Sequence, residues 1–220
     1  MNEQEWFARD WPATMLDLLV SQTGAVAERK FQLFGCAMCR RIERLLDAAG
    51  LTLVDTAERH ALGRAAESEL RTTRGMVKLP VIDAKDPRTG ARFYAAQGAV
   101  QLGELKTAVA VREFLSGTLA ASLCDPGAPE RLDGYASGLF RCLFANPFRP
   151  TTAFEAEWLT DTVFTLAQQM YESRDFYAMP ILADALQDAG CDNADILDHC
   201  RGAGPHVRGC WVVDLALGKE

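Results

Sequence analysis

One stretch near the C-terminus indicates how this chain folds: Asp198-His199-Cys200-Arg201-Gly202-Ala203-Gly204-Pro205-His206-Val207-Arg208-Gly209-Cys210-Trp211. Gly202 is placed to end the helix before it, and Pro205 fits the first turn of a helix that follows. The stretch holds two Cys, two His and two Arg, more reactive side chains than any comparable part of the chain. It predicts short helices joined by tight turns, with a candidate site at the turn.

Helical spacing recurs upstream of this stretch. Leu159, Val163, Leu166 and Met170 lie at i, i+4, i+7 and i+11, which is the spacing of one helix face. Apolar residues within 28–49 form a similar stripe, and Gly50 is positioned to end that helix. We therefore predict a mostly α fold, a single-domain helical array over residues 1–220.

Two segments interrupt the helical pattern. The first lies near residues 76–95, where Val77-Lys78-Leu79-Pro80-Val81-Ile82-Asp83 is rich in β-formers, a turn sequence follows at residues 86–90, and Arg92-Phe93-Tyr94 could return as a second strand. This pattern predicts a small irregular or β-hairpin insertion. The second is Cys124-Asp125-Pro126-Gly127-Ala128-Pro129, which marks a candidate subdomain boundary near 123–130.

Composition and charge indicate which cellular compartment and which classes of partner to expect. The net charge of -7 argues against nucleic-acid binding, because contacts to phosphates need a basic face. The acidic, polar start Met1-Asn2-Glu3-Gln4-Glu5 is unlike a secretory signal, and the apolar runs are too short to span a bilayer. We therefore expect a cytoplasmic protein with a protein partner, and neither nucleic acid nor membrane as a partner.

Seven Cys in a reducing compartment favour buried thiols or metal ligands over disulfides. Cys36 and Cys39 form a Cys-x-x-Cys pair inside a predicted helix with no strand before it. A redox motif of the thioredoxin kind follows a strand, so zinc binding is the functional reading that remains. The alternative is a pair of small buried thiols.

The C-terminal stretch offers further metal ligands. If the last helix begins near Pro205, His206 and Cys210 lie at i and i+4 on one face, and His199 or Cys200 ends the helix before the turn. Thiolates with one or two imidazoles are ligands that zinc favours. We predict five zinc ligands: Cys36, Cys39, Cys200, His206 and Cys210. The alternative is that His206 packs at a helix start while Cys200 and Cys210 belong to the core.

Three stretches taken together resemble a known family: residues 29–41, residues 145–150, and the C-terminal run from Met179 to Trp211, which includes His206-Val207-Arg208-Gly209-Cys210-Trp211. They are similar to a large paralogous family of uncharacterised bacterial proteins, best represented in planctomycetes. Residues 76–94 depart from that family, which is helical and alanine-rich there. The family has no established activity or ligand, so the resemblance implies membership and not function.

Two hypotheses for function follow from these residues. No complete catalytic constellation is present, which favours a non-catalytic protein-interaction module with a structural zinc ion. The alternative is a metal-dependent hydrolase or transferase at the C-terminal turn, which needs an open coordination position and a general base such as Asp184 or Asp198.

Overall fold

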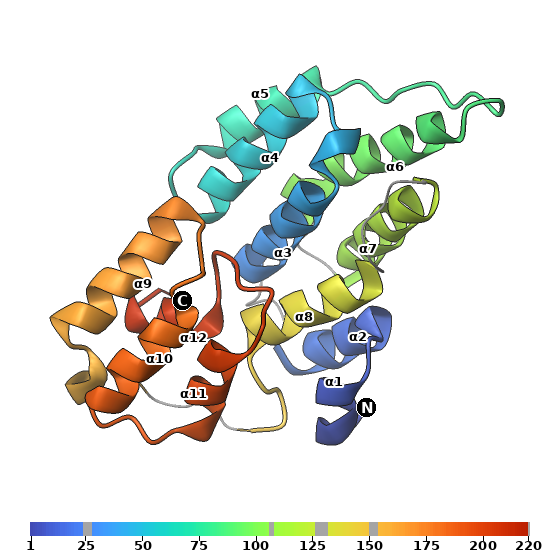
Figure 1. Cartoon of the computed structure of the whole chain (residues 1–220). Helices are drawn as coiled ribbons and strands as arrows, with labels where there is room; N and C mark the ends of the chain where they lie inside the picture. The colour runs from blue at the N-terminus through green and yellow to red at the C-terminus, as the bar shows by residue number, and fades with distance from the viewer. Residues whose placement is uncertain (24–27, 106–107, 126–131, 150–153, 220) are drawn as a thin grey trace. The chain divides into compact units, whose positions relative to one another are not determined.

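The computed structural model describes residues 1–23, 28–105, 108–125, 132–149 and 154–219, and within them the chain folds entirely as helices and connecting segments (Figure 1). Twelve α-helices and no strand occur in this described part, so the prediction of a mostly α fold is confirmed. The chain divides into two compact units. The first unit contains Met1 and Arg9–Ser137, and the second contains Asn2–Ala8 and the chain from Gly138 onward. The predicted boundary near 123–130 falls largely on residues 126–131, which lie outside the described residues.

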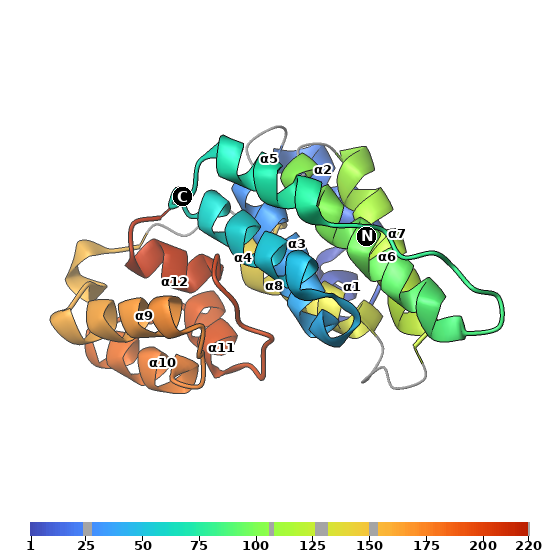
Figure 2. The same cartoon turned by 90° about the horizontal axis from the view of Figure 1, so that it is seen from above.

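The first unit is built around helix α3 (Glu28–Arg41), against which α4 (Ala48–Ala61), α6 (Pro87–Gln101) and α7 (Ala108–Leu123) all pack (Figure 2). Every residue from Phe31 to Cys39 is buried as a result, although the helix carries charged residues at both ends. The other helical elements of this unit are α2 (Pro12–Thr23), η2 (Glu43–Leu45), α5 (Glu67–Met76), η3 (Leu102–Glu104) and the first turns of α8 (Leu132–Phe144). A helix with neighbours on several sides is buried all round, so residues outside its apolar stripe are buried as well.

The helix predicted over residues 28–49 is not continuous in the structure. Helix α3 ends at Arg41, and α4 begins at Ala48. Asp47 caps α4, because its side chain accepts a hydrogen bond from the backbone N–H of Gly50 at 2.8 Å. Gly50 therefore lies in the first turn of a helix and does not end one.

Of the two alternatives for the insertion near residues 76–95, irregular or β-hairpin, the hairpin does not form, because its second strand is helical. Residues 77–83 are irregular, but α6 begins at Pro87, so Arg92-Phe93-Tyr94 lie in a helix and not in a returning strand. The side chain of Asp86 accepts a hydrogen bond from the N–H of Arg88 at 3.0 Å. An Asp cap followed by Pro starts a helix as well as it starts a turn, which is why the sequence was ambiguous here.

The second unit contains α1 (Glu3–Ala8), the end of α8, η4 (Ala156–Trp158), α9 (Asp161–Ser173), α10 (Met179–Asp188), α11 (Ala194–Arg201) and α12 (Trp211–Ala216). Helix α10 packs on both α9 and α11, and α12 packs on α9 and α11. The buried residues of α10 are Met179, Leu182, Ala183 and Leu186, the i, i+3, i+4, i+7 face of an amphipathic helix.

Helix α1 joins the second unit through specific polar contacts, although it stands far from the rest of that unit in sequence. Arg141 Nε donates a hydrogen bond to the carbonyl oxygen of Trp6 at 2.8 Å. Glu3 accepts hydrogen bonds from Asn146 at 2.6 Å and from Arg149 at 2.7 Å. Arg149 in turn reaches Asp195 on α11 at 2.8 Å, so one guanidinium ties α1 to α11.

No helix in the described ranges combines the length and the apolar character that crossing a bilayer requires.

Candidate metal centre

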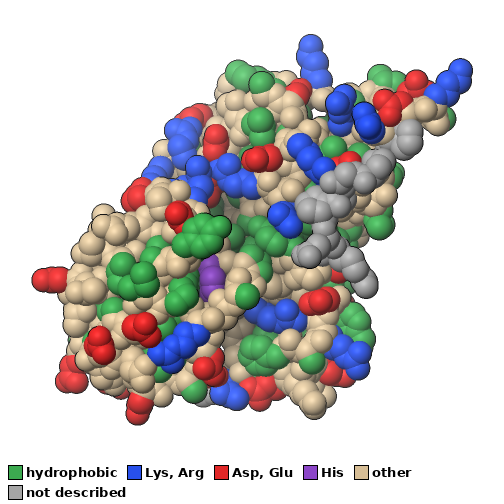
Figure 3. All heavy atoms as spheres, viewed as in Figure 1, with side chains coloured by type: hydrophobic (Ala, Val, Ile, Leu, Met, Phe, Trp, Pro, Cys, Tyr) green, Lys and Arg blue, Asp and Glu red, His purple; other side chains and the backbone are tan. Residues whose placement is uncertain are grey.

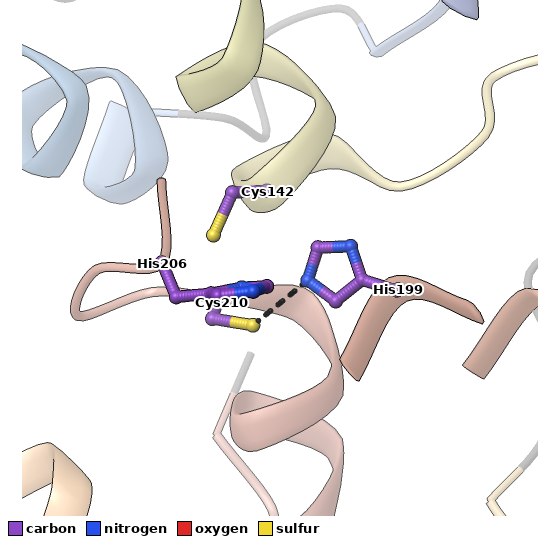
Figure 4. Close-up of side chains that lie close together, drawn as sticks. All are labelled: Cys142, His199, His206 and Cys210. Carbon is purple, nitrogen blue, oxygen red and sulfur yellow. Dashed lines mark hydrogen bonds between the residues drawn. The ribbon is translucent and has the colours of Figure 1, made fainter. Parts of the chain in front are cut away.

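Four Cys and His side chains converge in the second unit: Cys142, His199, His206 and Cys210 (Figure 4). One potential ligand atom from each lies within 4.8 Å of the others. Tetrahedral zinc with bonds of about 2.3 Å to sulfur and about 2.0–2.1 Å to nitrogen would place its ligand atoms roughly 3.3–3.8 Å apart. The four side chains are thus close to the spacing of a Cys₂His₂ site.

Each ligand comes from a different local structure. Cys142 lies on the last turns of α8, and His199 on the last turn of α11. His206 lies in the segment 202–210 that joins α11 to α12, and Cys210 is the residue that precedes α12. A centre of this kind would connect two helices, a loop and a helix start.

The segment 202–210 is a loop and not the start of the last helix. Gly204 and Gly209 have φ values of +85° and +90°, in the left-handed region that only Gly adopts readily, and such residues cannot continue a helix. The last helix therefore begins at Trp211, and the predicted start near Pro205 is wrong. His206 and Cys210 meet because the loop turns back, and not because they share a helix face.

The imidazole of His206 is held with one nitrogen available. Its Nε2 lies 3.1 Å from the carbonyl oxygen of Gly202, and because a carbonyl only accepts, Nε2 carries the proton of that hydrogen bond. Its Nδ1 is buried and has no hydrogen-bond partner. Metal-bound His residues usually donate their second ring N–H in this way, to a backbone carbonyl or a carboxylate.

His199 is fixed by packing and by its contact with sulfur. Its Nε2 lies 3.2 Å from Cys210 Sγ, the contact drawn as a dashed line in Figure 4. Its ring meets the ring of His206 edge-on, with centroids 4.9 Å apart, and it lies 5.4 Å from the ring of Trp211. His199 therefore contacts both the sulfur of Cys210 and the ring of His206.

The charges at the centre favour a thiolate at Cys210. Burial alone raises the pKa of this thiol, but hydrogen bonding with Cys142 and the nearby imidazole of His199 outweigh burial and bring the pKa well below its ordinary value. Burial lowers the pKa of His206, but the nearby sulfur of Cys210 and the hydrogen bond to the carbonyl oxygen of Gly202 outweigh burial, so this pKa is raised overall. The thiolate is the form of Cys that binds metal.

Arg208 anchors the loop at a point between its two potential ligands, His206 and Cys210. Its buried guanidinium donates hydrogen bonds to the carbonyl oxygens of Tyr171, from Nε at 2.5 Å, and of Glu172, from the terminal nitrogen at 2.7 Å. These carbonyls belong to the end of α9. The loop is therefore held on α9 between His206 and Cys210.

Gly138 gives the loop the space to approach α8. A Cβ added to Gly138 would overlap the ring of Pro205, and Cys142 lies one helical turn further along the same face. Gly138→Ala should therefore displace the loop and destabilise the protein by about 1–3 kcal/mol. The free energy of unfolding in urea measures this effect.

The control for this substitution is Gly117→Ala. Gly117 lies inside α7, and a Cβ there meets nothing within 4 Å. Ala is favoured over Gly in a helix interior by roughly 0.5–1 kcal/mol, so this variant should gain stability. If both variants gain stability alike, the close approach of Pro205 to α8 is refuted.

Of the ligands expected from the sequence, His206 and Cys210 belong to the cluster. Cys142 and His199 complete it, and neither was among the predicted ligands, although His199 was weighed against Cys200 as the residue before the turn. Cys200 is fully buried on α11 outside the cluster, and burial, followed by the neighbouring Cys210 and Cys191, raises the pKa of its thiol. Cys142 lies four residues after Gly138, but this spacing identifies no ligand until the loop is placed against α8.

Cys36 and Cys39 lie in the first unit, buried on α3. The thiol of Cys36 donates a long hydrogen bond to the carbonyl oxygen of Val54, with 3.8 Å between the two atoms. Burial raises the pKa of Cys39 to about 12, against the opposing effect of Arg40. Neither residue belongs to the cluster of four.

The proposed general bases lie on the surface of the second unit. Asp184 is exposed and accepts a hydrogen bond from Arg201 at 3.2 Å, and Asp198 is also exposed. The cluster itself contains two thiols and two imidazoles and no carboxylate.

No family model, curated protein or solved structure matches this chain, so the resemblance to the planctomycete family stays a prediction and the chemistry of the centre rests on its own geometry.

Proposed function

We propose that the protein is a non-catalytic protein-interaction module whose second unit is held together by a structural zinc ion bound by Cys142, His199, His206 and Cys210. The observation that carries this proposal is the convergence of the four ligand atoms within 4.8 Å of one another. Two sulfur and two nitrogen ligands suit zinc, because it accepts both kinds of ligand in tetrahedral geometry.

A structural role is favoured over a catalytic one by the number of protein ligands. A tetrahedral ion with four protein ligands has no open position, whereas catalytic zinc keeps one for water or substrate. The sulfur atoms are also shielded, since Cys142 is 1% exposed and Cys210 is 0% exposed. A protein of this kind would act through its surface, where the second unit presents large apolar side chains such as Tyr177 and Ile181.

The test is the metal content of untagged, chelator-washed protein, followed by zinc X-ray absorption. We expect about one zinc per chain, with two sulfur and two nitrogen ligands and no oxygen ligand. An oxygen ligand from water would favour the metal-dependent hydrolase or transferase instead, since it would indicate an open position. Folded protein without metal would refute the zinc proposal.

A further inference from the structure

A second feature lies in the first unit, where the segment from Val77 to Asp86 extends beyond the ends of α5 and α6 (Figures 1 and 2). Its large apolar side chains face solvent, although such residues are normally buried. The exposed fractions are 47% for Leu79, 88% for Val81 and 50% for Ile82, and 57% for Met76 just before the segment.

Basic residues surround these apolar side chains. Residues 74–92 contain five Lys or Arg and two Asp, within a chain whose net charge is -7. Four of the basic side chains, Lys78, Lys85, Arg88 and Arg92, are exposed and take part in no salt bridge in the described part of the chain. Arg88 and Arg92 lie one turn apart on α6. Figure 3 shows Lys and Arg side chains gathered at this end.

The two acidic residues of the segment are already engaged. Asp83 accepts a hydrogen bond from the backbone N–H of Lys85 at 2.9 Å, and Asp86 caps α6. The local excess of positive charge is therefore not cancelled by ion pairs within the segment.

The geometry points to the surface of an anionic lipid bilayer as the ligand of this segment, which we call the basic loop (residues 77–86 with Arg88 and Arg92). Aliphatic side chains at the extended end would enter the headgroup region, while Lys and Arg would meet lipid phosphates. Screening at physiological salt confines the field of distant acidic residues to roughly 8 Å, so the negative net charge does not prevent this local attraction.

The backbone of the basic loop limits how deep it could lie. Lys78 to Ile82 contribute to no helix or strand, so their N–H and C=O groups need water. The hydrated interface supplies that water, and the hydrocarbon core does not. The inference is thus peripheral binding at the membrane surface and not insertion across the bilayer. It differs from the expectation, made from the sequence, that a membrane is not a partner.

The experiment is cosedimentation of the full chain with large unilamellar vesicles of phosphatidylcholine and phosphatidylglycerol at three to one. Wild type should bind these vesicles at 50 mM salt, bind vesicles of phosphatidylcholine alone far less, and dissociate at 500 mM salt. Lys78→Glu with Lys85→Glu should lower the partition coefficient by at least about thirtyfold, from about 1 kcal/mol for each basic residue near the surface. Val81→Asp should weaken binding as well.

Matched controls carry the same chemical changes elsewhere on the first unit. Val109→Asp places a charge on an exposed aliphatic position of α7, and Arg59→Glu with Arg112→Glu repeats the change of charge at two exposed ion pairs. These variants should bind vesicles as wild type does. Weak wild-type binding, equal binding to neutral vesicles, or an equal loss in the controls would each overturn the inference.

One further outcome would assign the basic loop to another ligand. If the wild type forms dimers in sedimentation velocity, Val81→Asp abolishes them and no vesicle binding is seen, the extended segment pairs with a second copy of the chain and not with lipid. None of these results depends on zinc, so failure here leaves the proposed zinc centre untouched.

Discussion

Replacing Cys210 with Ala is expected to abolish the proposed zinc binding, together with most of the stability that a bound zinc ion would give to the second unit. Cys210 is fully buried and contacts His199 at 3.2 Å, and its neighbours bring the pKa of its thiol well below the ordinary value. Even partners outside the first coordination shell are worth about 10–100-fold in metal affinity, so loss of a direct ligand should cost more than about a hundredfold.

The loss of stability follows from the linkage between binding and folding. Zinc at a thousand times its dissociation constant stabilises a folded protein by about 4 kcal/mol, and the variant should lose that increment. The melting temperature with saturating zinc and after chelation measures it. Wild type should show a large difference between the two conditions, and Cys210→Ala almost none.

Cys200→Ala is the matched control. Cys200 is equally buried and lies next to His199 in sequence, but it is outside the cluster. It should lose some stability through a small cavity in both conditions, and it should keep about one zinc per chain. Loss of zinc from both variants would favour the ligand set expected from the sequence, which contains Cys200 as well as Cys210, and zinc retained by the Cys210 variant would refute the cluster as the zinc site.

The second large effect is expected in the first unit. Phe114 on α7 is fully buried and meets the ring of Phe34 edge-on, with centroids 6.3 Å apart. Phe114→Ala should destabilise the unit by about 3–5 kcal/mol, because it removes buried apolar surface and leaves a cavity between α3 and α7. Hydrogen exchange of amides in α3 and α7 should accelerate accordingly.

Phe164→Ala provides the comparison for this variant. Phe164 lies on α9 and is 46% exposed, so its removal should change stability by roughly 0.5 kcal/mol or less. Neither Phe variant should change the amount of bound zinc. Similar losses for Phe114 and Phe164 would mean that α3 and α7 do not pack as described.

The helical fold could be predicted because its signals are local. The limits of α11 and the start of α10 follow from Asn193, Gly202 and Pro180, which act on the adjoining backbone alone. The break between α3 and α4 was missed because Gly50 fits a helix end as well as a first turn. Burial of Cys36 was one of two alternatives, and the sequence could not decide between them, because burial depends on helices that are distant in sequence.

The centre was only half predictable for the same reason. His206 and Cys210 stand close together in the sequence, so their proximity was visible. In the sequence, Cys142 cannot be distinguished from an ordinary apolar residue of α8, because only the structure shows that the loop packs against Gly138. His199 and Cys200 are neighbours, and only the rotation of α11 decides that His199 faces the cluster while Cys200 faces the interior.

The position of Cys142 has a consequence for the order of folding. Cys142 is separated from the other three ligands by α9, α10 and most of α11, so a bound ion would close a long loop that contains these helices. Closing a long loop costs chain entropy, and the contacts that offset this cost form only once the loop is closed. His199, His206 and Cys210 can gather first as a local group, and the arrival of α8 would then complete the site late. Zinc would therefore slow unfolding more than it speeds refolding.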